Sequence, residues 1–158
     1  MQIVRDNFAM TAPGIATTSG QIFAASGANT IAARFPDFAT TATAQTTAST
    51  SYVDLATVGP SVTNVTVGTR GVIIYGCQMA NNTVNGTCSY APTGATLASP
   101  SDSQALAFTS ATANAAMQAS YALFLGGMTP GTYTFVMKYR VSAGTGTFQD
   151  RRCQVIPF

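Results

Sequence analysis

The side chains that most often carry enzyme chemistry are scarce in this chain of 158 residues. It contains no histidine and no glutamate, and its charged residues are seven lysines or arginines and five aspartates. Serine and cysteine hydrolases normally use histidine as the general base, and most zinc sites combine histidine with cysteine. The composition therefore disfavours both kinds of site.

Carboxylates and a single lysine are the remaining candidates for catalysis. Asp102 and Asp150 could supply the two carboxyl groups of a glycoside hydrolase if the fold brought them together. Lys138, which a Ser–Lys dyad would need, alternates with Arg140 in a pattern typical of an exposed strand face. The chain also lacks a G-x-x-x-x-G-K-S/T phosphate-binding motif. We expect a protein that is not an enzyme, with no catalytic residue, cofactor or metal ion.

The three cysteines, Cys77, Cys88 and Cys153, do not form a disulfide scaffold. If residues 71–79 and 87–93 made a hairpin, Cys77 and Cys88 would face each other, because cross-strand Cβ atoms lie about 4.5–5.5 Å apart. A disulfide and two buried free thiols both fit this arrangement, and the lack of a visible export signal favours free thiols. Cys153 is expected to be a small core or edge residue, since no histidine can activate it.

The charges near the C-terminus are candidates for contacts between subunits. Asp150, Arg151 and Arg152 could form ion pairs across an interface, because arginine makes fork-like bidentate pairs with carboxylates. They could equally belong to a solvated edge strand whose charges oppose aggregation. Arg140 lies in the preceding segment, and the terminal Phe158 is expected to pack into a core or a subunit seam.

Residues 50–158 have the pattern of strands separated by turns rich in glycine, proline and asparagine. Residues 132–141 alternate most clearly, and residues 71–79 form the continuous apolar run of a buried strand. Val62 and Val65 are out of phase, which indicates a bulge. In the last strand, the residues predicted to share one face are Phe148, Asp150, Arg152, Gln154, Ile156 and Phe158.

About eight such strands predict an all-β fold, a single β-sandwich and most plausibly a jelly roll. An immunoglobulin-like sandwich is the alternative, although the chain has no tryptophan. The Ala-rich segment 111–122 could be helical by propensity. Its Thr, Ser and Asn neighbours and the aromatic residues that follow favour a strand.

Residues 1–49 are predicted to form an extended N-terminal arm and linker before the sandwich domain of residues 50–158. The arm is rich in Ala, Thr, Ser and Gly, and residues 40–50 resemble a linker. Its isolated apolar residues could each fill a pocket on a partner. The alternative is that they form edge strands of the main domain. The expected contact residues of the arm are Phe8, Ile22, Phe23, Phe35 and Phe38.

The scarcity of charge indicates a surface that partners cover. Only 8% of the residues are charged, against about a quarter in an ordinary soluble domain. The net charge of +2 is too small to predict nucleic-acid binding, and no apolar run reaches the ~18 residues of a membrane span. The longest neutral stretch, residues 103–137, contains strands that we expect at subunit seams.

Two segments resemble a small β-domain of virion structural proteins in tailed bacteriophages. They are TTASTSYVDLATVGPSVTNVTVGTRG (46–71) and LGGMTPGTYTFVMKYRVSAGTGTFQDRRCQVIPF (125–158). The resemblance is carried by Tyr52, Asp54, Leu55, Gly59, Pro60, Gly131, Tyr133, Phe135, Tyr139, Arg140, Phe148, Arg151 or Arg152, Ile156 and Pro157. It implies a component of the virion. Such domains occur in head-decorating, minor tail and fibre proteins alike.

A short chain with an arm and one compact domain suits a capsid decoration, or cement, protein. Its expected partners are the major capsid protein and further copies of itself, in a homotrimer. Neither nucleic acid nor a membrane is expected. The alternative is a minor tail, fibre or adaptor protein whose β-sandwich binds a receptor or a host-surface glycan. Its location would be the virion in both cases, at the capsid surface or in the tail.

Overall fold

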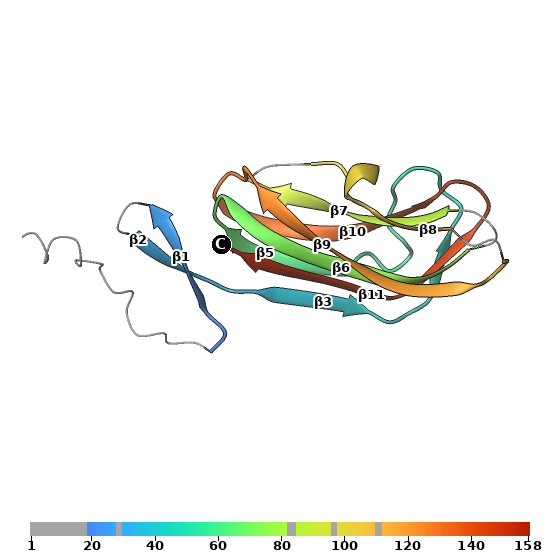
Figure 1. Ribbon diagram of the computed structural model, residues 1–158, viewed down its shortest axis with the longest axis horizontal. Coiled ribbons are helices and arrows are strands. Elements are labelled where there is room, and N and C mark those ends of the chain that lie inside the picture. Colours follow the sequence, from blue (N-terminus) through green and yellow to red (C-terminus); the bar gives the residue numbers. More distant parts are fainter. Residues whose placement is uncertain (1–18, 28–29, 82–84, 96–97, 110–111) are drawn as a thin grey trace, which may run out of the picture.

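The computed structural model describes residues 19–27, 30–81, 85–95, 98–109 and 112–158, which fold mainly into antiparallel strands. Two sheets pack face to face as a β-sandwich, and a two-stranded hairpin lies beyond one end of it (Figure 1). The predicted all-β sandwich is therefore confirmed. Phe8 lies outside the described residues.

The sandwich consists of two sheets, which we name sheet I and sheet II. In spatial order, sheet I contains β3 (Asp37–Thr41), β11 (Gly146–Pro157), β6 (Arg70–Asn81) and β9 (Ala116–Gly126), with β4 (Gln45–Thr47) also paired to β11. Sheet II contains β5 (Ser61–Val67), β10 (Gly131–Val141), β7 (Asn85–Gly94) and β8 (Leu106–Thr109). Within the described residues, the helical element is the short η1 (Asp102–Gln104), and no helix is long and apolar enough to cross a membrane.

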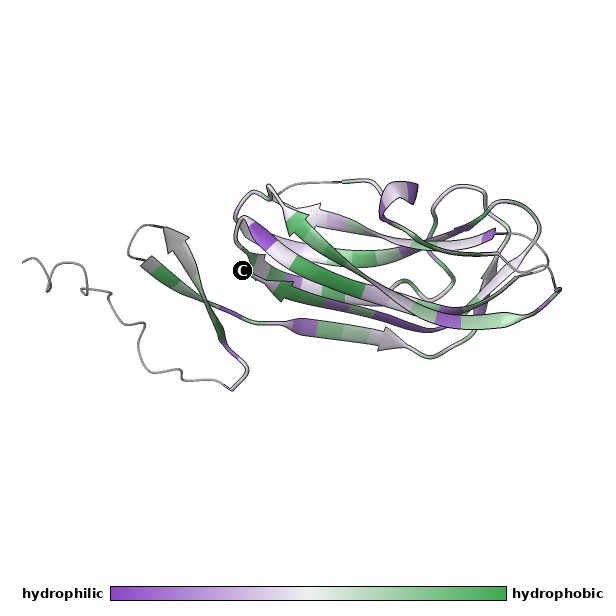
Figure 2. Ribbon diagram, in the orientation of Figure 1, coloured by the Kyte–Doolittle hydropathy of each residue, from purple (hydrophilic) through white to green (hydrophobic). Residues whose placement is uncertain are grey.

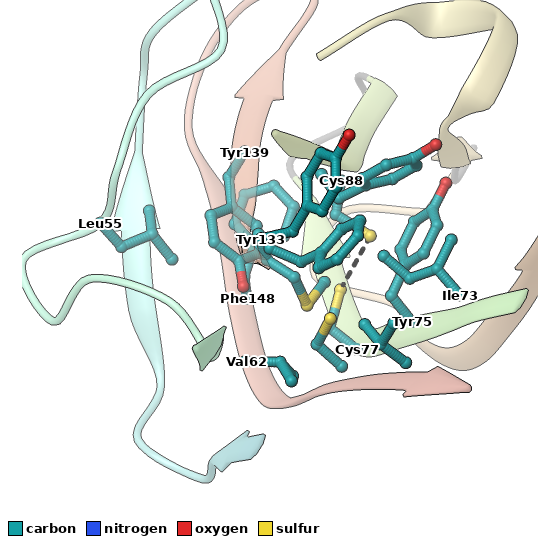
Figure 3. Packing of buried hydrophobic residues seen from close by; sticks show 14 of the residues in the cluster. Leu55, Val62, Ile73, Tyr75, Cys77, Cys88, Tyr133, Tyr139 and Phe148 are labelled. Carbon is teal, nitrogen blue, oxygen red and sulfur yellow. Dashed lines mark hydrogen bonds between the residues drawn. The ribbon is translucent and has the colours of Figure 1, made fainter. Parts of the chain in front are cut away.

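Strand β10 shows how the alternating pattern builds the core. Tyr133, Phe135, Met137 and Tyr139 all point inward and are at most 1% exposed. Their neighbours in sequence lie on the outer face of sheet II and are partly exposed. Aromatic rings from both sheets meet between them, as Tyr139 and Phe148 do at a centroid distance of 5.1 Å (Figure 3). The period of two therefore placed this strand correctly.

Two bulges interrupt the regular pairing. The first is in β5, where the register with β10 shifts between Val65 and Val62, as their phase predicted, and Asn64 takes a φ of 60°. The second is in β11, where Asp150 has a φ of 47° and the register with β6 shifts. This bulge turns Phe148 to the buried side together with Arg151, so the predicted shared face of residues 148–158 is wrong at Phe148.

The predicted hairpin between residues 71–79 and 87–93 is wrong, because β6 and β7 belong to different sheets. Cys77 and Cys88 nevertheless meet, with their Sγ atoms 3.5 Å apart across the interior between the sheets (Figure 3). Both are buried free thiols, as is Cys153. The hydrogen bond between the two thiols and burial raise the pKa of Cys88, and burial raises the pKa of Cys153 to about 12.

Residues 37–47 belong to the sandwich, so the expected linker at residues 40–50 is corrected to an edge strand with a break. β3 and β4 pair with successive parts of β11, and Ala39 packs against the core. This matches the alternative of edge strands. Alanine and threonine are small and nearly neutral in hydropathy, so their alternation gave no visible period.

The hairpin beyond the sandwich consists of β1 (Ile22–Gly27) and β2 (Thr30–Arg34). Phe23 within it and Phe35 after it are both exposed. A two-stranded hairpin by itself is marginally stable in water. The chain then passes through Pro36 into β3, which joins the hairpin to the edge of sheet I.

Candidate interaction surface

The outer face of sheet I is a solvent-exposed surface built from the outward-pointing residues of four strands. Burial alternates along β3, β9 and β11, and along most of β6, which fixes the direction of each side chain. We name this surface the sheet I face. It consists of Phe38, Thr40, Arg70, Val72, Ile74, Gly76, Gln78, Gln118, Ser120, Ala122, Phe124, Arg152, Gln154 and Ile156.

One half of the sheet I face is largely apolar. Phe124, Val72 and Ile156 form one cross-strand row, and the next row joins Ala122, Ile74, Gln154 and Phe38. Figure 2 shows the hydrophobic colour running along β6, at the centre of this sheet.

Two phenylalanines at opposite edges of this half are far more exposed than aromatic residues usually are. Phe124 is 83% exposed and Phe38 is 70% exposed. Burying a phenylalanine side chain stabilises by about 1.5–3 kcal/mol. The two rings therefore offer a partner substantial binding free energy that the isolated fold does not use.

The next cross-strand row, which contains Thr40, Arg152, Gly76 and Ser120, begins the more polar half of the sheet I face. A shallow groove of about 490 Å³ crosses the face there, at Gly76. Arg152 and Ser120, the neighbours of Gly76 on β11 and β9, line it together with Phe38 and Asp150. A Cβ atom on Gly76 would lie 2.2 Å from the carbonyl oxygen of Ala119. Only glycine allows β9 to approach this closely, and its missing side chain leaves the groove.

The sheet I face carries two arginines: Arg152 lies beside the groove, and Arg70 lies at the end of β6, in phase with Val72 and Ile74. Asp150 lines the groove from the bulge of β11, yet no ion pair joins Asp150 to Arg152 among the described residues. Binding to this surface would therefore depend on apolar contact far more than on charge.

The outer face of sheet II is organised in a different way. The segment 49–60 runs beside β10, where Val53 and Tyr139 exchange backbone hydrogen bonds of 2.9 and 3.0 Å. A second segment covers β7, since the Ser89 hydroxyl donates to the carbonyl oxygens of Ser101 and Gln104. Ser89 is fully buried as a result.

All four charged side chains of this second face are paired. Lys138 contacts Asp54 at 2.7 Å, and the guanidinium of Arg140 makes a two-pronged contact with Asp102 at 3.0 and 2.6 Å. Tyr52 donates to Asp102 at 2.7 Å, and Arg140 also lies over the Tyr52 ring. The Tyr52 hydrogen bond and then the Arg140 contact hold the pKa of Asp102 below its usual range. These charges attach the covering segments to β10.

Arg151 is an internal residue and not the inter-subunit contact expected from the sequence. It is fully buried, and its guanidinium donates to the carbonyl oxygens of Thr57 at 3.2 Å and Gly59 at 2.9 Å. It also donates to the Gln45 side chain at 3.0 Å and lies over the Tyr139 ring. Arg151 thus ties β4 and the segment 49–60 to the core.

The other predicted contact residues are scattered. Phe38, Arg152 and Asp150 meet at the sheet I face or its groove, whereas Arg140 lies on sheet II, paired with Asp102. The remaining members lie near the projecting hairpin or the chain end: Ile22, Phe23, Phe35 and Phe158. Phe158 is tied down by its backbone, which donates to Arg70 and accepts from Gly68.

Three members of the sheet I face, Phe124, Val72 and Ile74, are not among the contact residues expected from the sequence, whereas Phe38 is. Residues 71–79 are continuously apolar, which predicts a buried strand and does not separate Val72 and Ile74 from the core. The available signal was the uncharged stretch 103–137, which contains β9 and was expected at a seam.

The structure brings none of the candidate catalytic groups together. Asp102 lies against β10 of sheet II, whereas Asp150 belongs to β11 of sheet I. Lys138 is paired with Asp54. Among the described residues, no group of three histidine, cysteine, aspartate or glutamate side chains is placed to hold a metal ion.

No family model matches the sequence, and no curated protein matches it. Among solved structures, a chain from the structure of infectious bursal disease virus, Gx strain, is similar with a TM-score of 0.46 and 12% sequence identity. The match covers 92% of this chain and 37% of that chain, so this chain spans little more than a third of the length of the viral one.

Proposed function

We propose that this protein is a non-enzymatic structural component of a tailed-bacteriophage virion that decorates the capsid and stabilises the major capsid lattice. The observation that carries the proposal is the sheet I face, on which Phe38 and Phe124 stand exposed at either edge of an apolar surface. Large exposed apolar patches commonly mark protein interaction sites. The resemblance of residues 46–71 and 125–158 to virion β-domains supports a partner within the virion.

The strand order supports a jelly roll, which we propose as the type of sandwich. If β3 and β4 are taken as one interrupted strand, the chain after the hairpin forms eight strands. The first pairs with the eighth, the second with the seventh, the third with the sixth and the fourth with the fifth. A long antiparallel hairpin rolled into two sheets gives this order. Jelly rolls occur in viral capsid and lectin domains, although a fold alone does not determine function.

Capsid attachment through the sheet I face would bury apolar surface and involve few ion pairs. Its affinity should therefore change little with salt, since screening weakens mainly exposed charge interactions. Because a ligand that binds only the assembled shell stabilises it by mass action, a saturating amount of this protein should raise the temperature at which the capsid disassembles.

The test is to restore purified protein to capsids that have been stripped of it and to measure binding and capsid melting. Phe38→Ser and Phe124→Ser should each weaken binding by about tenfold or more, since each removes about 1.5–3 kcal/mol of apolar burial. Val58→Ser is the matched control, because Val58 is 59% exposed but lies on the segment that runs beside sheet II. Equal loss with Val58→Ser, or no loss with either phenylalanine variant, would contradict the proposal.

The number of copies per virion distinguishes a location on the head lattice from the alternative location in the tail. Hundreds of copies would support attachment to the head lattice. Three to a few tens of copies would support a tail or fibre component, which the same sheet I face could attach to its neighbours.

A further inference from the structure

We propose that two copies of this protein associate by antiparallel pairing of their β9 strands, which joins both copies of sheet I into one continuous sheet. The inference is independent of capsid binding and rests on the edges of the two sheets. A sheet edge presents a row of unpaired backbone N–H and C=O groups, to which another strand can pair. The sandwich has four such edges: β3 with β4, β9, β5 and β8.

Three of these edges have features that oppose pairing with another chain. The β3–β4 edge is divided into strands of five and three residues. The β5 edge contains the bulge at Asn64, and β8 is only four residues long. Short strands, interruptions and bulges are the usual means by which natural proteins protect sheet edges.

The β9 edge has none of these protective features. Its 11 residues, from Ala116 to Gly126, pair with β6 without any shift in register. Its sequence, AMQASYALFLG, includes neither a charged residue nor a proline. Among the described residues β6 is the one strand that pairs with β9, so no described strand takes up the backbone groups on the opposite side of β9.

A second copy of β9 is the partner that fits this edge. Two identical strands can pair antiparallel about a twofold axis, which is the symmetry of most homodimers. The β9 strands of two copies have the same length. Because β9 carries no charge, the repulsion that like charges cause across paired strands is absent. A dimer of this kind differs from the homotrimer expected from the sequence.

The side chains beside the β9 edge also support a second copy of β9 as the strand that pairs there. Tyr121 packs edge-on against Tyr75 at a centroid distance of 6.0 Å, yet Tyr121 remains 37% exposed. Among the described strands, none lies beyond β9 in sheet I. On the other side of the sheet, Phe124 is almost fully exposed. A second β9 would lie beside both positions and would extend the sheet I face across the two copies.

The first experiment measures the mass of the isolated full-length protein over a range of concentrations by light scattering. We expect a reversible dimer. The double variant Ser120→Lys, Ala122→Lys places cations in the middle of both paired strands and should weaken dimerisation by roughly tenfold or more. The control, Thr40→Lys with Gln154→Lys, adds the same charge to the sheet I face on β3 and β11, and should remain dimeric. A monomeric wild-type protein, or equal weakening by both double variants, would overturn the proposal.

The second experiment does not depend on a variant that could disturb folding. Single cysteines are introduced one at a time from Gln118 to Phe124, and disulfide-linked dimers are measured under mild oxidation. The native cysteines are at most 1% exposed and should not react. Cross-linking should peak sharply at one position, the one nearest the twofold axis, and should be weak for Thr40→Cys. Equal cross-linking at all positions would overturn the proposal, as would a maximum at Thr40. Both experiments use the protein without capsids. The dimer proposal can therefore fail while capsid binding is confirmed, and capsid binding can fail while the dimer is confirmed.

Discussion

The two outer faces of the sandwich use their few charged residues in opposite ways. On sheet II, Lys138 and Arg140 are paired with Asp54 and Asp102, which belong to segments that lie over or beside the sheet. On sheet I, Arg152 and Arg70 lie on a surface edged by exposed phenylalanines, and neither belongs to the ion pairs found among the described residues. One face is partly covered by segments of its own chain, and the other leaves two large apolar residues exposed.

In a chain with so few charges, the ion pairs indicate which surface is covered by segments of the chain itself. Exposed ion pairs contribute little to stability, about 0–1 kcal/mol each, so those of sheet II serve mainly to hold the covering segments in position. The apolar residues of the sheet I face contribute little to the isolated fold because they remain in water. If this account is right, substitutions on the sheet I face should spare folding and affect assembly.

The largest expected effect contrasts two adjacent arginines of β11. Arg151→Met should destabilise the isolated protein by about 3 kcal/mol or more, because it leaves several buried acceptors, including the Gly59 carbonyl oxygen, without a donor. Arg152→Met should change stability by at most about 0.5 kcal/mol, as is usual for exposed positions. Urea unfolding followed by tyrosine fluorescence measures both. Similar losses in the two variants would show that the distinction between interior and face is wrong.

A medium effect is expected at the groove. Gly76→Ala places a Cβ atom against the carbonyl oxygen of Ala119 and the Cα atom of Ser120, at 2.2 and 2.7 Å. Relief requires movement of β9, so we expect a loss of about 1–3 kcal/mol and weaker dimerisation. Gly126→Ala is the control, since nothing lies within 4 Å of a Cβ atom there. A neutral Gly76→Ala in thermal unfolding would contradict the close approach of β9.

The smallest expected effect tests whether Asp102 helps to attach the covering segments to sheet II. The pKa of Asp102 is lowered in the folded protein, first by the Tyr52 hydrogen bond and then by Arg140. Its contribution to stability is therefore present above the unfolded pKa of about 3.9 and is lost as the pH falls through the lower folded value. Asp102→Asn should be slightly less stable than the wild type at pH 7, and the gap should close below about pH 4. A gap that persists unchanged at pH 2 would contradict this role of Asp102.

The sequence was most informative where apolar residues at buried positions alternate with polar residues at exposed positions. The inward row from Tyr133 to Tyr139 identified β10 because large aromatic residues alternate with threonine and charged residues. The bulge of β5 was also visible, as Val62 and Val65 are out of phase.

Other features could not be predicted, for identifiable physical reasons. The bulge at Asp150 inverts the phase of β11, so Phe148 and Arg151 share the buried side although their spacing is odd. The run from Val72 to Tyr75 is apolar on both sides, and sequence alone does not separate residues buried by the fold from residues that a partner would bury. Cys77 and Cys88 were correctly paired in space, but through the wrong arrangement, because sheet assignment depends on contacts far apart in the chain.

The most direct test of the central claim compares hydroxyl-radical labelling of the free protein with labelling of the protein in intact virions. Phe38 and Phe124 are exposed in the isolated chain and should label readily. In the virion their labelling should fall several-fold, while that of Tyr52 and Val58, on the side of sheet II, should change little. Full labelling of both phenylalanines in the virion, or equal protection of Tyr52 and Val58, would contradict the account that the sheet I face is the surface by which this protein is built into a larger assembly.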